Sequence, residues 1–390
     1  MTDKKFNVDN KTDCTACGLC INICPVKSIE MKQNEEGFYV PFVNNDKCIN
    51  CGRCIRECIV TDGKNAQIHE KKFYAATSKC SERRNSSSGG IFYALANQII
   101  NNGGVVYGCA IGEDMTAMHI RAENHEELKK TLKSKYVQSY IMNVYKTLED
   151  DLKNNRQVLF SGTPCQVAAI KKQFSGYSNL FLVDIVCHGV SSPSFFKEHI
   201  SYLEKKYNSR VTAYSFRNKI KKLGYIEKIT LQNNKVITRK AFKSFYFSSF
   251  LNMNAYNNYC YKCRFASMDR PGDITLGDYH WGIKKHSNMK DKMDSPYDLS
   301  MVMTNSEKGD NMLRKLEKDI YLEKTDLDLI LERNKNLQKP SERPVKSENF
   351  YKELKEKGYR QCEKEYRHTK KYLRNIFPLN IIVKLKNKFI

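Results

Sequence analysis

Two runs of cysteines near the start of the chain have the spacing needed to hold iron–sulfur clusters. Each run reads C-x2-C-x2-C-x3-C, the pattern by which one polypeptide wraps two cubane clusters. Three thiolates of a run face one cluster, and the fourth thiolate binds the other cluster. The first cluster would therefore be bound by Cys14, Cys17, Cys20 and Cys58, and the second cluster by Cys48, Cys51, Cys54 and Cys24.

The same cysteines could instead form disulfides or two zinc sites. Disulfides need an oxidising compartment, which nothing in the sequence indicates. Zinc sites usually take two C-x2-C pairs, not a triplet with a distant fourth thiolate. Gly18 and Gly52 follow the second thiolate of each run and let the backbone bend close to inorganic sulfide. The sequence therefore favours two [4Fe-4S] clusters.

The composition favours a cytoplasmic metalloprotein. Residues 1–10 are polar and contain no apolar segment of a secretion signal, and no apolar run is long enough to cross a bilayer. We therefore expect a cytoplasmic protein whose 15 cysteines serve metal or redox chemistry. With 390 residues, the chain can form two or three domains that each bury a core.

The formal net charge of +23 indicates acidic partners. Two cubanes with four thiolates each would remove about four of these charges, which leaves the chain basic. A basic balance suits nucleic acid, an anionic membrane surface or phosphorylated cofactors. No nucleic-acid-reading motif accompanies the charge, so we expect no nucleic acid partner. The tail 372–390 mixes cations with apolar residues and could touch a membrane, although packing against the body is the simpler expectation.

The sequence divides into three parts. Residues 1–66 form the expected α+β ferredoxin-type module with two clusters. Residues 70–340 form an expected α/β domain, with a first part at about 70–150 and a second part at about 155–340. Residues 341–390 are expected to be a basic, solvated helical extension.

Alternating strands and helices after residue 70 predict a mainly parallel sheet, made mixed by antiparallel additions. Helices are expected at 91–100, 140–152 and 167–174 and after Ser192. Strands are expected at 37–43, 105–110, 158–160, 180–186, 210–218, 225–232, 235–242, 274–276 and 300–304. After Ser306 the pattern is helical and strongly charged to the end.

Four further cysteines could hold a third cluster. Cys165 lies at the second position of a predicted helix, where the helix dipole lowers the pKa of a thiol. Cys187 follows the next strand, and Cys260 and Cys263 form a C-x2-C pair. Together they favour another [4Fe-4S] cluster; the alternative is that Cys187 is a small core residue and Cys165 a redox thiol. The cysteines expected to be structural are Cys80, Cys109 and Cys362.

Two stretches could bind a phosphorylated cofactor. Residues 87–90 (Ser-Ser-Gly-Gly) precede a predicted helix, where backbone amides bind anions, although a serine–glycine linker would look the same. Residues 134–139 combine a cation, an aromatic ring and an amide in Lys135, Tyr136 and Gln138, which suits a dinucleotide. An ordinary amphipathic edge is the simpler interpretation of this second stretch.

Residues 277–282 place an aspartate and the single tryptophan between two glycines. The pattern suits contact with a planar ligand, and a packed turn is the simpler explanation. His188 and His280 could donate protons, although a lone histidine is more often a hydrogen-bonded structural residue.

Taken together, these stretches resemble the coenzyme F-420 hydrogenase/dehydrogenase beta-subunit family. The likeness covers about residues 70–340, and its motifs occur in the order of the family. The motifs are residues 87–92, 134–139, 161–166, 184–190, 260–265 and 273–279. Bacterial relatives with an N-terminal ferredoxin module often occur among polysaccharide-biosynthesis proteins.

The resemblance implies an α/β flavoprotein that holds FAD beside an iron–sulfur cluster. Such a protein passes electrons between a hydride carrier and one-electron carriers, because a flavin handles both kinds of transfer. By motif position, the residues implied for FAD are Ser87, Ser88, Gly89, Gly90, Lys135, Tyr136, Gln138, Gly162, Thr163 and Asp278.

The leading hypothesis is an iron–sulfur flavoprotein oxidoreductase that works with a redox partner protein or ferredoxin and a small-molecule hydride donor or acceptor. The alternative is a non-catalytic subunit that relays electrons to a partner enzyme, with a possible place in polysaccharide biosynthesis. A third hypothesis is a nucleotide-sugar-modifying enzyme whose cysteines are vestigial.

Overall fold

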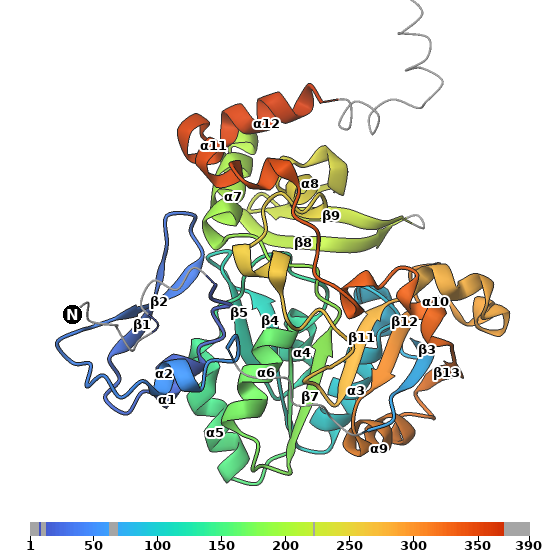
Figure 1. Cartoon of the computed structure of the whole chain (residues 1–390). Coiled ribbons are helices and arrows are strands. Elements are labelled where there is room, and N and C mark those ends of the chain that lie inside the picture. Colours follow the sequence, from blue (N-terminus) through green and yellow to red (C-terminus); the bar gives the residue numbers. More distant parts are fainter. Residues whose placement is uncertain (1–7, 9–12, 62–68, 221–222, 370–390) are drawn as a thin grey trace, which may run out of the picture.

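The computed structural model describes residue 8 and residues 13–61, 69–220 and 223–369 (Figure 1). A small module with both cysteine runs lies against one side of a large sheet domain. A third, partly helical lobe lies at one end of that sheet. The predicted tail at 372–390 falls outside the described residues.

The N-terminal module repeats one local structure twice. Short helices α1 (Leu19–Ile23) and α2 (Arg53–Arg56) follow the second thiolate of each run. Before them, the φ angles of Gly18 and Gly52 are 78° and 67°. These left-handed angles favour glycine and confirm the expected tight bends. Between the helices, β1 (Ile29–Gln33) and β2 (Tyr39–Val43) form an antiparallel hairpin, of which only β2 was expected.

The central sheet has eight strands in the order β13-β3-β12-β11-β7-β6-β4-β5. The strands are β3 (Lys72–Ser78), β4 (Val105–Ile111), β5 (Ala117–Ala122), β6 (Val158–Gly162), β7 (Leu180–Ile185), β11 (Ile274–Asp278), β12 (Ser300–Thr304) and β13 (Ile320–Lys324). Only the run β4-β6-β7-β11 is parallel, and the other four pairings are antiparallel. The mixed sheet is as expected, but fewer pairings are parallel than expected, because β12, β3 and β13 alternate in direction along one edge and β5 is antiparallel on the other.

Helices cover both faces of the sheet. They are α3 (Ile91–Asn101), α4 (His125–Thr131), α5 (Tyr145–Lys153), α6 (Pro164–Gln173), α9 (Glu307–Lys315) and α10 (Leu327–Leu331). Leu159 of β6 packs with α3, and its neighbours Val158 and Phe160 pack with α5 and α6. Because both faces are covered, the strand reads as a continuous apolar run.

The helix expected at 140–152 is shorter than predicted. Tyr140 forms a bridge with Met118, and a short 3-10 turn precedes α5. Every strand expected from the sequence is present, β12 with the expected ends and the others with shifted ends, whereas β3, β5 and β13 were not expected as strands. The 3-10 turns are Ser81–Asn85, Met142–Val144, Ala241–Lys243, Asn258–Lys262, His280–Lys284, Ser287–Lys292, Lys335–Leu337 and Val345–Ser347.

The outer lobe packs helices against a three-stranded antiparallel sheet. Its elements are α7 (Pro193–Tyr207), β8 (Val211–Ile220), β9 (Leu223–Leu231), β10 (Val236–Lys240), α8 (Phe245–Leu251), α11 (Phe350–Lys357) and α12 (Tyr359–Arg367). Phe350, Leu354 and Tyr359 are buried in the aromatic core of this lobe. The expectation that everything after residue 340 is a solvated extension was therefore wrong for α11 and α12, because their apolar faces complete that core.

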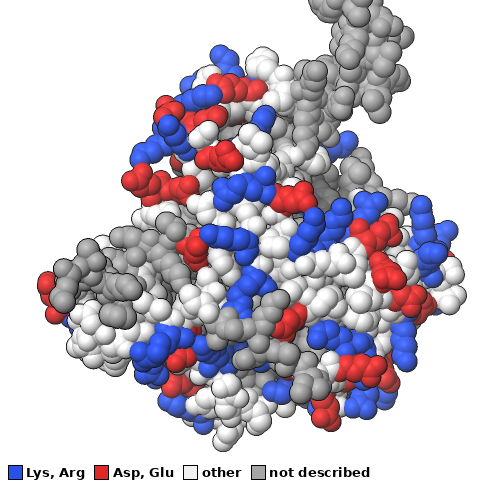
Figure 2. Space-filling model, in the orientation of Figure 1, with Lys and Arg blue, Asp and Glu red and all other residues white. Residues whose placement is uncertain are grey.

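On the face shown in Figure 2, cations and carboxylates of the described residues are mixed. Within the described part of the chain, no helix has both the length and the apolar composition that a bilayer crossing requires.

Gly89 lies in a closely packed segment before α3. A Cβ at this position would lie 2.5 Å from the carbonyl oxygen of Ala76 and 2.9 Å from the amide nitrogen of Ser300. Gly89→Ala should therefore lower the free energy of unfolding by about 1–3 kcal/mol, the usual cost of overpacking. Gly176→Ala is the matched control, because nothing lies within 4 Å of its added Cβ. Equal urea midpoints for the two variants would contradict this packing.

Candidate redox centres

The structure brings the first triplet of cysteines together with the fourth cysteine of the second run. One small cavity is lined by Cys14, Cys17, Cys20 and Cys58. Burial raises the pKa of Cys17 to about 11, and the neighbouring Cys58 adds to this rise. The grouping matches the one that the spacing predicts for the first cluster.

The second group lies closer to solvent. Cys24, Cys48 and Cys54 pack together against Val8 and Ile29. Cys51, in contrast, is exposed. Burial alone would raise the pKa of Cys24, but hydrogen bonds from Ser28 lower it overall.

All 15 cysteines are described, and all are free thiols, so no disulfide framework forms. Among the described residues, no three histidine, cysteine or carboxylate side chains converge on the position of a single metal ion. A cubane binds each thiolate to a different iron, so its sulfurs stand further apart than the four ligands of one zinc ion. The thiol groups therefore fit clusters better than single ions.

The third set of cysteines also comes together. Cys165 begins α6, Cys187 follows β7, and Cys260 and Cys263 lie in and just after a 3-10 turn. Burial raises the pKa of all four thiols, and the charges of the others in the set raise it further for Cys165, Cys187 and Cys260. The expectation that the helix N-terminus lowers the pKa of Cys165 was wrong, because burial outweighs the helix dipole.

A buried ion pair fixes the two loops that carry this set. The side chains of Arg270 and Asp184 are 1% and 0% exposed, and their Nη2 and Oδ1 atoms are 2.6 Å apart. Arg270 also donates to the carbonyls of Phe265 and Ile185, at 2.7 and 2.8 Å. It therefore links the segment after Cys263 to the end of β7, just before Cys187.

An apolar seam joins the first and third thiol groups. Leu19 and Ile23 of α1 pack with Ala169 of α6, and Cys17, Cys165 and Cys263 lie against the same cluster. The buried Tyr145 donates a hydrogen bond of 2.7 Å to the carbonyl of Cys17. Burial raises the pKa of Tyr145, and the charges of cysteines from both groups, among them Cys17 and Cys165, raise it further. The two groups are thus direct neighbours.

Asp278, at the end of β11, lies in a polar constellation beside the third set. Arg217 donates to Asp278 at 2.9 Å and to the carbonyl of Ser87 at 3.1 Å. Burial would raise the pKa of Asp278, but Arg217 lowers it overall. Burial lowers the pKa of His188 and His280, and in both cases the charge of Asp278 opposes this effect.

Irregular pairing in β8 makes this arrangement possible. Register shifts interrupt the β8–β9 ladder between Ser215 and Asn218 and between Asn218 and Ile220. Phe216, Arg217 and Asn218 are consequently all buried, although consecutive residues of a regular strand face opposite sides. Beyond this break in alternation, no sequence signal pointed to Arg217.

Residues 87–90 form hydrogen bonds with other residues of the protein. The hydroxyl of Ser88 donates to the carbonyl of Leu299, and the amide of Gly89 donates to the hydroxyl of Ser300. Close packing therefore explains the glycines, and the amide of Gly89 is not free for an anion. Ser87 instead accepts a hydrogen bond from the amide of Ser134, which joins this segment to residues 134–139.

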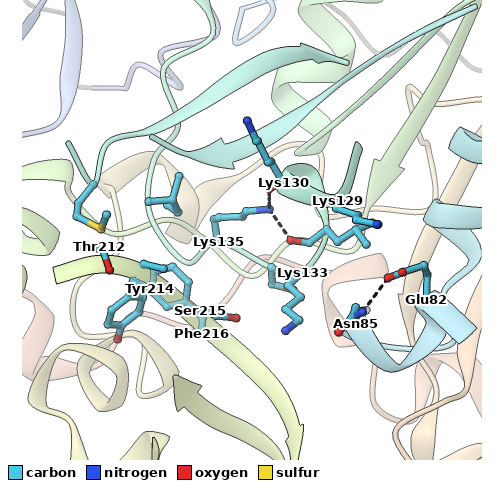
Figure 3. A pocket seen from close by; sticks show the side chains of 15 residues that line it. Glu82, Asn85, Lys129, Lys130, Lys133, Lys135, Thr212, Tyr214, Ser215 and Phe216 are labelled. Carbon is cyan, nitrogen blue, oxygen red and sulfur yellow. Dashed lines mark hydrogen bonds between the residues drawn. The ribbon is translucent and has the colours of Figure 1, made fainter. Parts of the chain in front are cut away.

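A lysine-rich pocket opens beside Ser134 (Figure 3). Its volume is about 360 Å³, and Lys129, Lys130, Lys133 and Lys135 line it. Lys133 donates to the side-chain oxygen of Asn218, and Lys135 to the carbonyls of Leu132 and Lys130. Burial lowers the pKa of Lys135 to about 8. Glu82 also lines the pocket and Lys129 pairs with Glu126, but the acceptors of Lys133 and Lys135 are neutral, so the pocket keeps surplus positive charge.

The remaining predicted flavin residues do not line this pocket. Thr163 contacts Cys165, with its hydroxyl 3.1 Å from the sulfur, and Gly162 precedes it, so both lie with the third thiol set. Gln138 accepts a hydrogen bond from the amide of Tyr39 and ties the sheet domain to the N-terminal hairpin. The ring of Tyr136 stacks on Phe250 at 4.4 Å.

Comparison with protein families gives two matches. The C-terminal part of the coenzyme F420 hydrogenase/dehydrogenase beta subunit matches residues 155–329. The 4Fe-4S dicluster domain matches residues 13–61.

Several relatives of known name match stretches of the chain. A subunit of the F(420)H(2) dehydrogenase of Methanosarcina mazei is 25% identical over 171 residues, which cover 40% of this chain and 47% of that protein. The coenzyme F420-dependent sulfite reductase of Methanocaldococcus jannaschii is 25% identical over 163 residues, covering 41% of this chain and 25% of that protein. The VorC subunit of the ketoisovalerate oxidoreductase of Methanothermobacter marburgensis is 37% identical over 57 residues, covering 14% of this chain and 72% of that protein.

The chain thus spans less than half the length of the first two relatives. Among solved structures, a chain of the F420-reducing [NiFe] hydrogenase complex from Methanosarcina barkeri has a TM-score of 0.47 and 16% identity, covering 76% of this chain and 95% of that chain.

Lys219 holds the segment 87–90 in place. It bonds to Asp298 at 2.5 Å and to the carbonyl of Ser88 at 2.6 Å, and the two charged side chains are 7% and 1% exposed. Lys219→Met should lower the free energy of unfolding by about 3 kcal/mol, because it leaves a buried carboxylate without its ammonium partner. Lys146→Met removes an exposed ion pair and serves as the control. Urea unfolding checks the difference, and similar midpoints would contradict the role of Lys219.

Proposed function

The chain belongs to the coenzyme F420 hydrogenase/dehydrogenase beta-subunit family and carries a 4Fe-4S dicluster domain, and from this premise we propose that it is an iron–sulfur flavoprotein oxidoreductase. Two N-terminal [4Fe-4S] clusters, a third cluster and FAD would connect a one-electron carrier with a hydride donor or acceptor. The relatives named above are proteins or subunits of oxidoreductases, which supports this class of activity.

The apolar seam between α1 and α6 carries the proposal. It makes Cys17 of the first group and Cys165 of the third group neighbours of one buried cluster of side chains. An electron on the first cluster would then have a short, dry path to the third. The exposure of Cys51 supports a position nearest to solvent for the second cluster. The order of transfer would be second cluster, first cluster, third cluster, flavin.

Bound FAD would supply the conversion between two-electron hydride chemistry and one-electron cluster chemistry. The constellation of Asp278, Arg217 and His188 suits the flavin ring, because His188 directly follows Cys187 of the third set. The lysine pocket suits the pyrophosphate, because Lys133 and Lys135 have neutral hydrogen-bond acceptors and surplus charge. Ser87 and Tyr136 lie between these two regions. Each of them contacts both Ser134, which lines the lysine pocket, and Arg217, which pairs with Asp278.

The hydride partner belongs to this proposal as well. Names of the relatives point to coenzyme F420, and a deazaflavin is therefore the first compound to test as donor or acceptor. The placement in polysaccharide biosynthesis rests on the resemblance of the sequence alone.

Iron content tests the third cluster. Anaerobically purified protein should contain about twelve irons per chain, four for each of three cubanes. Cys260→Ser should reduce the content to about eight irons, because it removes one ligand of the third set. Cys80→Ser is the control, since Cys80 lies outside the three thiol groups. About eight irons in the unchanged protein, or no loss in Cys260→Ser, would contradict a third cluster.

The lysine pocket predicts pH-dependent binding of a pyrophosphate. The pKa of Lys135 is lowered from its ordinary value of 10.5 to about 8. An anionic ligand favours the charged ammonium, so affinity for ADP should fall as the pH rises from about 7 to 9.5, while Lys135 loses its proton. Lys135→Met should bind ADP about tenfold or more weakly at pH 7 and lose this pH dependence.

Calorimetry measures the ADP affinity directly. Lys235→Met, an exposed residue at the β9–β10 turn, is the matched control and should behave as the unchanged protein. An affinity that stays constant between pH 7 and 9.5 would contradict the assignment of the pocket.

A further inference from the structure

The second thiol group is the one through which electrons can enter from outside. Cys51 is exposed, whereas the cysteines of the first and third groups are at least partly covered. The first group adjoins both the second group and the sheet domain, because Cys20 packs against the same apolar cluster as Cys24 and Cys48, and Cys17 packs against the α1–α6 seam. A docked carrier would therefore reach the second cluster first.

Exposed residues close in sequence to the cysteines of the second thiol group are basic and partly apolar. We call this set the entry face and define it by Lys27, Lys47, Ile49, Cys51, Arg53 and Arg56. Ile49 is 61% exposed, which is unusual for a large apolar side chain. Nearby Val26 is 38% exposed and lies in the turn that follows Cys24.

The cations of the entry face outnumber its free carboxylates. Lys27, Lys47 and Arg53 have no carboxylate partner among the residues that the structure describes, and Arg56 bonds to the carbonyl of Cys51 at 2.7 Å. Of the nearby acidic residues, Glu57 is paired with Lys172 at 3.2 Å. Asp46 is the remaining exposed carboxylate in the described part of this segment.

An apolar centre ringed by like charges suits a transient complex. Electron-transfer complexes bury little area and depend on complementary charge for fast, correctly oriented encounter. We propose that the entry face docks an acidic one-electron carrier protein, whose carboxylates surround its own exposed redox centre. The inference rests on the proposed function, because it assumes that Cys24, Cys48, Cys51 and Cys54 hold a cluster.

The test uses the anaerobically purified full chain and an acidic ferredoxin in its reduced form. Lys47→Glu/Arg53→Glu should lower the second-order rate constant for reduction at low ionic strength by at least about tenfold, because steering by charge is lost. The rate of the unchanged protein should fall steeply with salt, and that of the double variant should not. Lys205→Glu/Lys235→Glu, with the same charge change on the outer lobe, is the matched control and should keep the original rate.

Three readouts separate the outcomes. Reduction by methyl viologen radical, a small cation, should be at least as fast in the double variant, and its iron content should be unchanged. If the ferredoxin rates of the double variant and the control agree within about twofold, the docking face is wrong although the clusters are present. If the double variant instead loses binding to anionic phospholipid vesicles while its ferredoxin rate is unchanged, the face contacts a membrane and the proposal is overturned. Absence of iron would overturn the proposed function itself.

Discussion

The dry contact between α1 and α6 is the constraint on which the rest of the structure depends. It is made by Leu19 and Ile23 on one side and Ala169 on the other, and small residues on α6 allow the two helices to approach closely. Tyr145 closes the seam by bonding to the carbonyl of Cys17. The hydrogen bond from the amide of Tyr39 to Gln138 also ties the module to the sheet domain, whereas the α1–α6 contact lies between the first and third thiol groups.

The sheet domain positions the other end of the path. Cys165 stands at the start of α6, directly after β6, and Cys187 stands after β7, the adjacent parallel strand. Carboxyl ends of neighbouring parallel strands lie at one edge, where open α/β sheets gather their sites. Arg270 and Asp184 then fix the loop that brings Cys263 to this edge. The bulged strand β8 adds Arg217 from the outer lobe, so all three parts of the chain contribute to one region.

Local spacing explains what could be predicted from the sequence. The cysteine runs, the glycine bends at Gly18 and Gly52 and the strands β6 and β7 depend on neighbours in the chain, and the structure agrees with each. The convergence of Cys165, Cys187, Cys260 and Cys263 could be proposed because the first two follow predicted strands and the last two form a C-x2-C pair. Tyr145, Arg217 and Lys133 could not be found, because their roles depend on contacts between elements far apart in the sequence. The same limit explains why α11 and α12 were taken for solvated helices: their charged faces dominate the composition, whereas Phe350 and Tyr359 are buried.

Clusters held by the first and third thiol groups would be immediate neighbours, and the proposed electron path depends on this proximity. Electron paramagnetic resonance of the fully reduced protein tests it most directly, since reduced clusters that are close together split and broaden each other's signals. We expect such an interaction in the unchanged protein, and its partial loss in Cys165→Ser with the N-terminal interaction between the first and second clusters retained. A spectrum that is the same in both proteins would contradict the proximity of the two clusters.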